Sequence, residues 1–372
     1  MHEQTACMSR LRKSDVVIAG GGIIGLSLGL ELLQRGLSVV LLERRVAMHA
    51  ASWAAGGMLA ARDPENPPDL LSLSLHSLAL YPTYLDRVRT LSGQPVPIRT
   101  RRTLQQVGPS YSAGADVIFD DAQKWVPGLT ETDGKFVWLE EDSFDPRDLC
   151  RALPMAFLAE KGILLEETPV LGVECSSSAV VVETTGKQIH AATFVNCRGA
   201  WAGDMHFGGI PVEPVKGQMV TVALAAERLR CVLRTPKFYA IPRGDGRVAI
   251  GATIEQAGFD ANVHEQYIAA ILHTAAEFIP EVEHASRLES WTGFRPGTPD
   301  DLPILGAADA SNCWHATGHY RNGILLAPAT ARVMAQLIFG ETPDLPLKVF
   351  SPARFPLKTA PDACSSVSYS AR

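Results

Sequence analysis

The stretch DVVIAGGGIIGLSLGLELLQRGLSVVLLERR, residues 15–45, decides the fold of this chain. It opens with a β-branched run, VVIAG (16–20), which is typical of a buried parallel strand. The glycines that follow fit the spacing G-x-G-x-x-G, as Gly20, Gly22 and Gly25. In that pattern the first glycine permits a tight turn, the second lets a pyrophosphate approach the backbone, and the third lets the next helix pack closely on the strand. The N–H groups at the start of that helix would then face the phosphates.

The elements after the glycines indicate a dinucleotide site. A helix is predicted to end at Gly36, and a second strand, 38–43, ends in Glu43. This acid lies 18 residues after the third glycine, near the offset at which a carboxylate receives ribose hydroxyls. Arg44 and Arg45 favour a solvated strand end over a 2′-phosphate site. The alternative is a glycine-tolerant turn in another α/β protein, and the pattern alone does not separate NAD from FAD.

Composition excludes several classes of protein. The 372 residues predict two domains, or one large domain with a long insertion, and 46% hydrophobic with 20% charged residues is an ordinary globular balance. The formal charge, 34 − 40 = −6, argues against nucleic acid as a partner. We find no run of about 18 apolar residues and no apolar signal-peptide core, so we expect no membrane span and a cytoplasmic protein.

The cysteines are dispersed and odd in number. No two form a C-x-x-C pair, which predicts reduced, buried thiols rather than a disulfide framework or a zinc site, and no metal site is expected elsewhere. The seven positions are 7, 150, 175, 197, 231, 313 and 364.

Six short blocks further along the chain carry a resemblance. They are SWAAGGML (52–59), PVKG (214–217), YAIPR (239–243), GAT (251–253), RPGTPDDLPILG (295–306) and GHYRNGILLAPAT (318–330). Together they resemble the D-amino acid oxidase superfamily of flavoenzymes, in consistent order over roughly residues 14–350. Within that superfamily, the chain is most similar to the glycine oxidases of bacterial thiamine biosynthesis.

The resemblance implies an α/β fold in which a Rossmann-like FAD-binding domain of the glutathione-reductase type is interleaved with a substrate domain built on an antiparallel sheet. It also implies noncovalent FAD, because no cysteine matches the covalent flavin linkage of sarcosine oxidases; Cys313 is the nearest. We expect residues 14–90, 146–213 and 290–345 in the FAD domain, 91–145 and 214–289 in the substrate domain, and 352–372 as a loosely ordered tail. A helix is predicted within 143–162, with Asp145 as its N-cap and Pro146 at its first position.

Three residues are candidates for the chemistry. Hydride transfer from an α-carbon directly to flavin needs no strong acid or base, so the protein positions the substrate and supplies electrostatics. The resemblance places Arg295 on the substrate carboxylate, which a planar guanidinium grips with two hydrogen bonds, and gives Tyr239 as a second partner. Arg321 would lie near the substrate, where positive charge stabilises negative charge on the flavin. The alternatives are a surface arginine at 295 and an ordinary strand aromatic at 239.

Four residues are predicted to line the substrate pocket: Met58, Lys237, Ile254 and His319. His319 is a structural residue on the flavin side in this interpretation, not a general base. In the glycine oxidase pattern a methionine stands where this chain has Ile254, and a histidine can stand where it has Lys237, which leaves the substrate's size open. Predicted cofactor contacts are Gly20, Gly22, Ile23, Ile24, Gly25, Glu43, Arg44, Ser52, Ala54, Ala55, Gly57, Met58, Val170, Gly199, Trp201, His319, Arg321, Asn322, Gly323 and Ile324.

The sequence therefore favours FAD-dependent oxidative deamination of glycine or a similar small amino acid (sarcosine or a small D-amino acid). O₂ would be reduced to H₂O₂, and thiamine biosynthesis would be the pathway. One alternative is a dehydrogenase of the same fold that passes electrons to a quinone. Another is a non-catalytic flavin-binding subunit, against which the set Arg295, Tyr239 and Arg321 argues. The partners expected are the amino acid and O₂, with a homo-oligomer left open.

Overall fold

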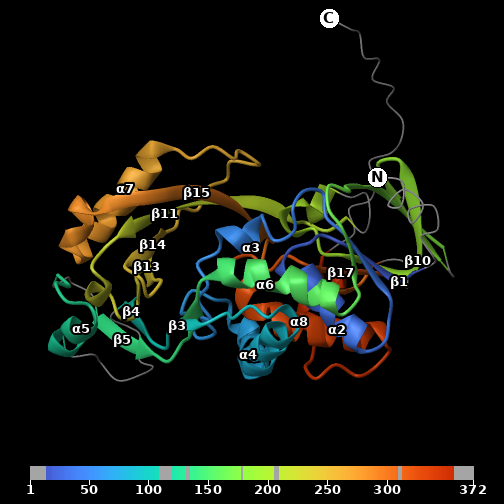
Figure 1. The fold of residues 1–372 in the computed structure, drawn as a ribbon, viewed down its shortest axis with the longest axis horizontal. Coiled ribbons are helices and arrows are strands. Elements are labelled where there is room, and N and C mark those ends of the chain that lie inside the picture. The colour runs from blue at the N-terminus through green and yellow to red at the C-terminus, as the bar shows by residue number, and fades with distance from the viewer. Residues whose placement is uncertain are drawn as a thin grey trace, which may run out of the picture.

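The computed structural model describes residues 14–108, 119–130, 135–176, 179–204, 209–308 and 312–355. Two large sheets lie side by side, and helices cover both (Figure 1). One sheet is mainly parallel and contains the glycine-rich opening, and the other is mainly antiparallel. The predicted fold class is therefore confirmed.

The first sheet has eight strands. They are β1 (Ser14–Ala19), β2 (Val39–Leu42), β7 (Ile163–Leu165), β8 (Val170–Cys175), β9 (Val180–Thr184), β10 (Lys187–Asn196), β16 (Ile304–Ala307) and β17 (Cys313–Thr317). The order is β16-β17-β10-β1-β2-β7, and β8 and β9 extend from β10 as antiparallel neighbours. The central pairs β1–β2, β1–β10, β10–β17 and β2–β7 are parallel.

Both faces of this sheet are buried, which explains the unbroken apolar run of β1. Val16 and Ile18 point into a core shared with the helices α2 (Ile23–Gln34), α4 (Leu71–Ser92), α6 (Pro146–Ala159) and α8 (Gly323–Ile338). The alternate residues Val17 and Ala19 point to the other face and pack with the strands β8 and β9. A parallel strand covered on both sides cannot show the polar alternation of a surface strand.

Two helix boundaries agree with their sequence signals. The glycine expected to end α2 is Gly36, whose φ of 89° lies in the left-handed region that favours glycine. The side chain of Asp145 accepts a hydrogen bond from the backbone N–H of Arg147 at 3.1 Å, so Asp145 is the N-cap of α6, with Pro146 first in the helix.

The second sheet has seven strands in the order β15-β11-β14-β13-β12-β4-β5. They are β4 (Thr103–Val107), β5 (Lys135–Leu139), β11 (Glu213–Ala223), β12 (Val232–Arg234), β13 (Tyr239–Pro242), β14 (Arg247–Gly251) and β15 (Ser286–Gly297). The helices α5 (Phe119–Trp125) and α7 (Glu265–Phe278) share a core with this sheet. A short helix α3 (Ala51–Ala54) and a two-stranded sheet, β3 (Ile98–Thr100) with β6 (Ser143–Phe144), lie between the two large sheets (Figure 1).

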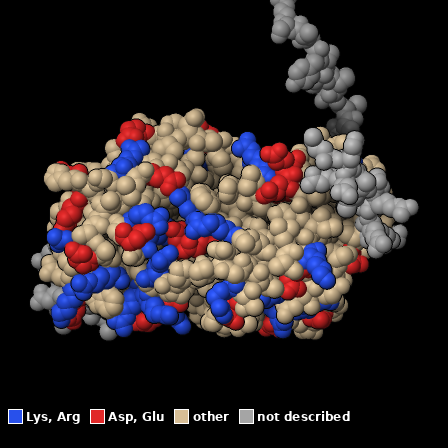
Figure 2. Space-filling model, in the orientation of Figure 1, with Lys and Arg blue, Asp and Glu red and all other residues tan. Residues whose placement is uncertain are grey.

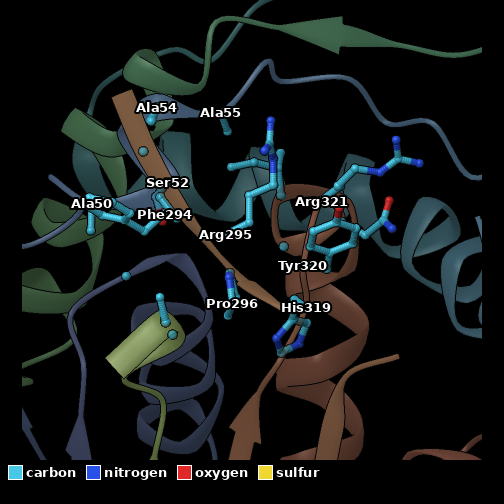
Figure 3. A pocket seen from close by; sticks show the side chains of 18 of the residues that line it. Ala50, Ser52, Ala54, Ala55, Phe294, Arg295, Pro296, His319, Tyr320 and Arg321 are labelled. Carbon is cyan, nitrogen blue, oxygen red and sulfur yellow. The ribbon is translucent and has the colours of Figure 1, made fainter. Parts of the chain in front are cut away.

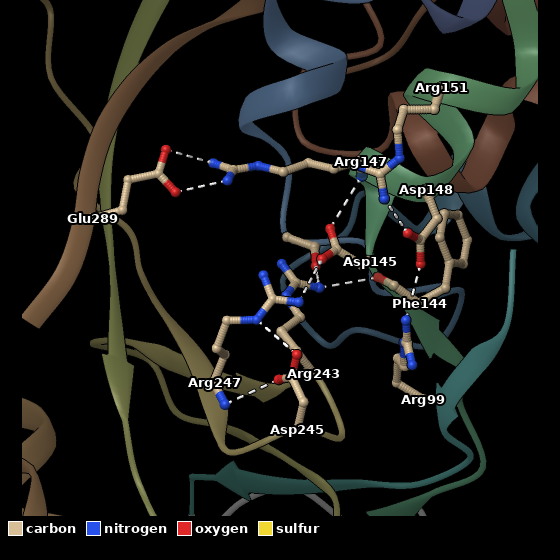
Figure 4. A network of polar contacts seen from close by, with 11 residues as sticks. Arg99, Phe144, Asp145, Arg147, Asp148, Arg151, Arg243, Asp245, Arg247 and Glu289 are labelled. Carbon is tan, nitrogen blue, oxygen red and sulfur yellow. Dashed lines mark hydrogen bonds and ion pairs between the residues drawn. The ribbon is translucent and has the colours of Figure 1, made fainter.

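Arginines connect the second sheet to α6 and to the segment that follows α3 (Figure 4). Arg147 of α6 forms a two-pronged ion pair with Glu289 of β15, at 2.7 and 3.1 Å. Arg243, the last residue of the YAIPR block, is buried and donates to the carbonyl oxygens of Gly56 and Phe144, each at 3.0 Å. A buried guanidinium that loses its acceptors costs free energy of folding. These contacts therefore fix the position of the second sheet relative to the segment that follows α3.

The domain boundaries proposed from the sequence place residues 290–297 with the first sheet, whereas β15 pairs with β11 along its whole length, in the second sheet. The predicted tail begins with a helical turn, Pro352–Arg354, in which Arg354 Nε lies 2.7 Å from Asp300 Oδ2. Residues 356–372 lie outside the described residues.

The expectation of reduced thiols is wrong for two cysteines. Cys175, at the end of β8, and Cys313, at the start of β17, form a disulfide although 138 residues separate them. Sequence spacing gave no signal, because the two strands approach each other only through β9 and β10. Cys150, Cys197 and Cys231 are free and buried, whereas residues 7 and 364 lie outside the described part of the chain.

The surface carries both signs of charge. On the face shown in Figure 2, Lys and Arg side chains are interspersed with Asp and Glu. Within the described ranges, no helix combines the length and apolarity that crossing a membrane requires. The same ranges contain no group of three His, Cys, Asp or Glu residues arranged to hold a metal ion.

Candidate active site

A long pocket between the two sheets brings together almost every residue predicted for the site (Figure 3). Its walls include the glycine-rich turn, the segment after α3, the start of β13, the end of β15 and the loop before α8. Gly25 is the one predicted residue that does not line the pocket.

Two positions of the glycine-rich turn, Gly20 and Gly25, have no room for a side chain. A Cβ atom at Gly20 would collide with the carbonyl of Cys197, and one at Gly25 would collide with the carbonyl of Gly20. Gly25 therefore allows α2 to approach β1, as the pattern predicts, without touching the pocket. A Cβ at Gly22 would meet only Ser52 Oγ, at 3.5 Å, so the backbone here is open to a ligand.

The amino-terminal end of α2 faces this open backbone. Ser52 Oγ accepts a hydrogen bond from the Ile23 N–H at 3.0 Å, which ties the segment of α3 to the glycine turn. The N-cap residue of α2 is Gly22, which has no side chain that could cap the helix. A helix end of this kind binds anions such as a pyrophosphate.

Glu43 is held in a fixed orientation at the end of β2. One carboxylate oxygen accepts from the N–H of Gly21 at 2.8 Å, and the other accepts from the N–H of Arg45 at 2.9 Å. Because each carboxylate oxygen can accept a second hydrogen bond, Glu43 retains two acceptor positions for ribose hydroxyls.

Arg44 is exposed, as expected for a solvated strand end, but it also forms part of the pocket wall. Its guanidinium carbon lies 3.5 Å from the centroid of the Trp201 ring, a cation–π contact. Phe259 stacks on Trp201, with ring centroids 4.8 Å apart and planes 12° apart. Val170 and Gly199 line the same pocket.

Arg295 presents a charge that no carboxylate of the described residues neutralises. Its Nη1 donates to the carbonyl oxygens of Thr253, at 3.0 Å, and Lys216, at 3.4 Å. The guanidinium occupies the space that a side chain at Gly217 would fill, because a Cβ there would lie 2.5 Å from both Nη atoms. A half-buried guanidinium without an anionic partner is suited to bind an anionic ligand.

Tyr239 lies in the same pocket, on β13. Among the described residues, its hydroxyl reaches only Met219 Sδ, at 3.6 Å, and a thioether is a weak acceptor. The hydroxyl is therefore available to a ligand in the pocket.

His319 is suited to a structural role. It is 2% exposed and its Nε2 lies 3.0 Å from Thr330 Oγ1 of α8. Burial lowers the pKa of His319 to about 3, so the ring is neutral near pH 7. A base of this strength does not take up a proton at that pH.

The remaining predicted pocket residues differ in exposure. Met58 is half-buried, Lys237 is exposed, and Ile254 is 61% exposed, so the last two lie toward solvent. Arg321 lines the pocket, but its Nη1 donates to Glu65 Oε2 at 2.6 Å.

The sequence did not point to several residues that shape this site. Gly217 stands inside the PVKG block, and a glycine within a strand is a signal of close approach by another group. Asp63, Glu65 and Arg234 also line the pocket. They gave no signal, because they lie in unremarkable polar stretches and meet only in the folded chain.

A glycine turn followed by an acid, with a pocket between the two sheets that holds the guanidinium of Arg295, is typical of a dinucleotide-dependent α/β enzyme. The chain belongs to the DAO family of FAD dependent oxidoreductases, whose model matches residues 15–337.

Relatives of known name agree with this family. The chain is 35% identical to the bifunctional protein ThiO/ThiG of Synechocystis sp., over 95% of this chain and 56% of that protein, so it spans about half of that relative. It is 32% identical to the glycine oxidase of Pseudomonas aeruginosa, over 91% of this chain and 98% of that one. The crystal structure of glycine oxidase from Geobacillus kaustophilus superposes with a TM-score of 0.86 at 30% identity, covering 92% of this chain and 99% of that one.

The residues present fit the FAD that the family implies. The open backbone at Gly22, the amino-terminal end of α2 and the oriented Glu43 form a site for a pyrophosphate and its ribose.

Proposed function

We propose that this protein is an FAD-dependent amino acid oxidase that acts on glycine or a similarly small amino acid and holds FAD noncovalently. The observation that carries this proposal is Arg295, a guanidinium in the pocket whose partners among the described residues are backbone carbonyls. An amino acid carboxylate provides the planar, two-oxygen anion that such a group prefers.

The proposed roles follow from the positions of the residues in the pocket. Gly20, Gly22, Ile23, Ile24 and Glu43 would hold the pyrophosphate and ribose. The adenine end would lie along Arg44, Val170, Gly199 and Trp201, and the segments Ser52–Met58 and His319–Ile324 would line the rest of the cofactor.

Arg295 and Tyr239 would bind the substrate carboxylate and so fix the position of the α-carbon. FAD held in this pocket would supply the acceptor for the hydride that leaves the α-carbon of the amino acid. His319 stays neutral and packs against α8, so it orients the loop 318–322 without taking a proton. For glycine, the overall reaction would be glycine + O₂ + H₂O → glyoxylate + NH₄⁺ + H₂O₂.

Relatives support the substrate class. Glycine oxidases at about one-third identity match nearly the whole chain. The resemblance to glycine oxidases of thiamine biosynthesis extends the proposal to that pathway, and growth of a thiamine auxotroph lacking its own oxidase would test this extension.

The decisive experiment is a turnover screen of the purified holoenzyme with glycine, sarcosine and D-alanine. H₂O₂ release is measured in air, and quinone reduction is measured without oxygen. Peroxide formed with at least one of these substrates supports the proposal, whereas electron transfer to quinone alone identifies a dehydrogenase. Heat denaturation should release free FAD into the supernatant, and flavin that stays with the precipitate would exclude noncovalent binding.

A further inference from the structure

A segment between α3 and α4 connects the two sides of the pocket through two carboxylates. We call residues 60–67 the strap. Asp63 Oδ2 lies 3.7 Å from Nε of Arg234, at the end of β12 in the second sheet. Glu65 Oε2 accepts from Nη1 of Arg321, in the loop before α8, at 2.6 Å. The strap thus contacts one arginine on each side.

Neighbouring hydrogen bonds hold the strap itself in place. Asn66 Nδ2 donates to the carbonyl of Ala60 at 3.0 Å, which closes the strap on itself. Asn66 Oδ1 accepts from Asn322 Nδ2, also at 3.0 Å, which fixes the strap beside Arg321. Glu65 therefore stays close to Arg321 whether or not their side chains are paired.

The two ion pairs differ in burial. The side chains of Asp63 and Arg234 are 12% and 5% exposed, and Arg234 also pairs with the buried Glu141 at 3.0 Å. The side chains of Glu65 and Arg321 are 48% and 26% exposed. Water competes with an exposed ion pair, so the Glu65–Arg321 pair is the one that a ligand can replace.

Arg295 and Arg321, the two arginines predicted to lie near the substrate, therefore differ in their charge partners. Arg295 has no carboxylate partner among the described residues, whereas Arg321 already has one. Figure 3 shows the Arg321 side chain turned away from Arg295, although both line the same pocket.

We propose that Glu65 competes with the substrate carboxylate for Arg321 and so sets the affinity of the enzyme for its amino acid. Arg295 binds the carboxylate first, because its charge is uncompensated. Arg321 then exchanges one carboxylate, that of Glu65, for another, that of the substrate. This inference rests on the proposed function, since it assumes a carboxylate ligand at Arg295.

The test is Glu65→Gln, which keeps the size of the side chain and removes its charge. Binding of acetate to the holoenzyme is measured by calorimetry at constant ionic strength, with sodium chloride as the balancing salt. We expect the dissociation constant for acetate and the KM for glycine to fall about two- to fivefold. This factor corresponds to the free energy of an exposed ion pair, and kcat should stay unchanged.

The chain offers a matched control. Glu341 is 49% exposed and pairs with Arg35 at 2.9 Å, outside the pocket. Glu341→Gln removes an equivalent charge and an equivalent ion pair, and it should leave acetate binding and KM unchanged. In an Arg321→Met background, Glu65→Gln should also have no effect, because the competition acts only through Arg321.

Unchanged acetate binding in Glu65→Gln overturns the inference, and so does weaker binding, which would mean that Glu65 holds Arg321 in place for the substrate. Absence of acetate binding in every variant overturns it as well. Calorimetry needs no turnover, so acetate binding without oxidation of any amino acid would refute the proposed function and leave the test of Glu65 intact.

Discussion

Gly217→Ala should disable substrate binding while leaving the fold intact. Gly217 lies on β11, and the guanidinium of Arg295 occupies the space beside its Cα. An added Cβ would lie 2.5 Å from Nη1 and Nη2 and 2.6 Å from Cζ, where ordinary contact begins at 3.4 Å. The guanidinium must therefore move by about 1 Å (3.4 − 2.5 = 0.9 Å).

That movement should change the free energy of unfolding little but weaken substrate binding. The displaced atoms are the end of a flexible side chain, so the free energy of unfolding should change by about 1 kcal/mol or less. The 3.0 Å hydrogen bond from Nη1 to Thr253 O would lengthen, and the guanidinium would lose its alignment with a bound carboxylate. Loss of a charge-assisted hydrogen bond costs about 1.5–3 kcal/mol, which corresponds to a KM roughly 10- to 150-fold higher.

The assay is steady-state oxidation of glycine by the holoenzyme, with bound flavin and melting temperature measured alongside. Gly108→Ala is the control, because a Cβ at Gly108, just after β4 in the same sheet, would meet no atom of the described residues within 4 Å. A KM within twofold of wild type in Gly217→Ala, with the variant folded and flavin bound, would show that Arg295 is not the carboxylate anchor.

Three further predictions follow from the same site. Glu43→Gln should weaken FAD binding by about 1.5–3 kcal/mol without changing substrate preference, because the amide loses a charge-assisted hydrogen bond to ribose. Fluorimetric titration of the apoprotein with FAD measures this affinity, and an unchanged affinity would show that Glu43 does not contact the cofactor. Arg295→Ala should raise the KM for every amino acid, by a factor of roughly 30 to several thousand, and Arg295→Lys should rescue it only in part; glycine turnover close to wild type would shift the role to Arg321. Burial lowers the pKa of His319 to about 3 in the folded protein, against an ordinary value of 6.5. Between these two pH values the unfolded chain binds more protons than the folded chain. The free energy of unfolding therefore falls as the pH drops through this window. Urea unfolding at pH 7 and pH 5 should therefore show wild type losing about 2 kcal/mol more than His319→Asn, and equal losses would mean that the ring is not buried as described.

The sequence alone determined the fold class and most of the residues around the pocket. Gly20, Gly22 and Gly25 act through the backbone, so their spacing along one short segment specifies the turn, the phosphate site and the helix contact together. The sequence also predicted the end of α2 at Gly36 and the N-cap Asp145, because capping depends on neighbours only a few residues away.

The tertiary structure alone decided which charges around the pocket are paired. Glu65 and Arg321 are 256 residues apart, and Cys175 and Cys313 are 138 residues apart, so no local pattern could join them. The same holds for Arg44 over Trp201 and for the space that Gly217 gives to Arg295. Local spacing specifies backbone geometry, whereas the state of a side-chain charge depends on groups that only the packing of two sheets brings within a few ångströms.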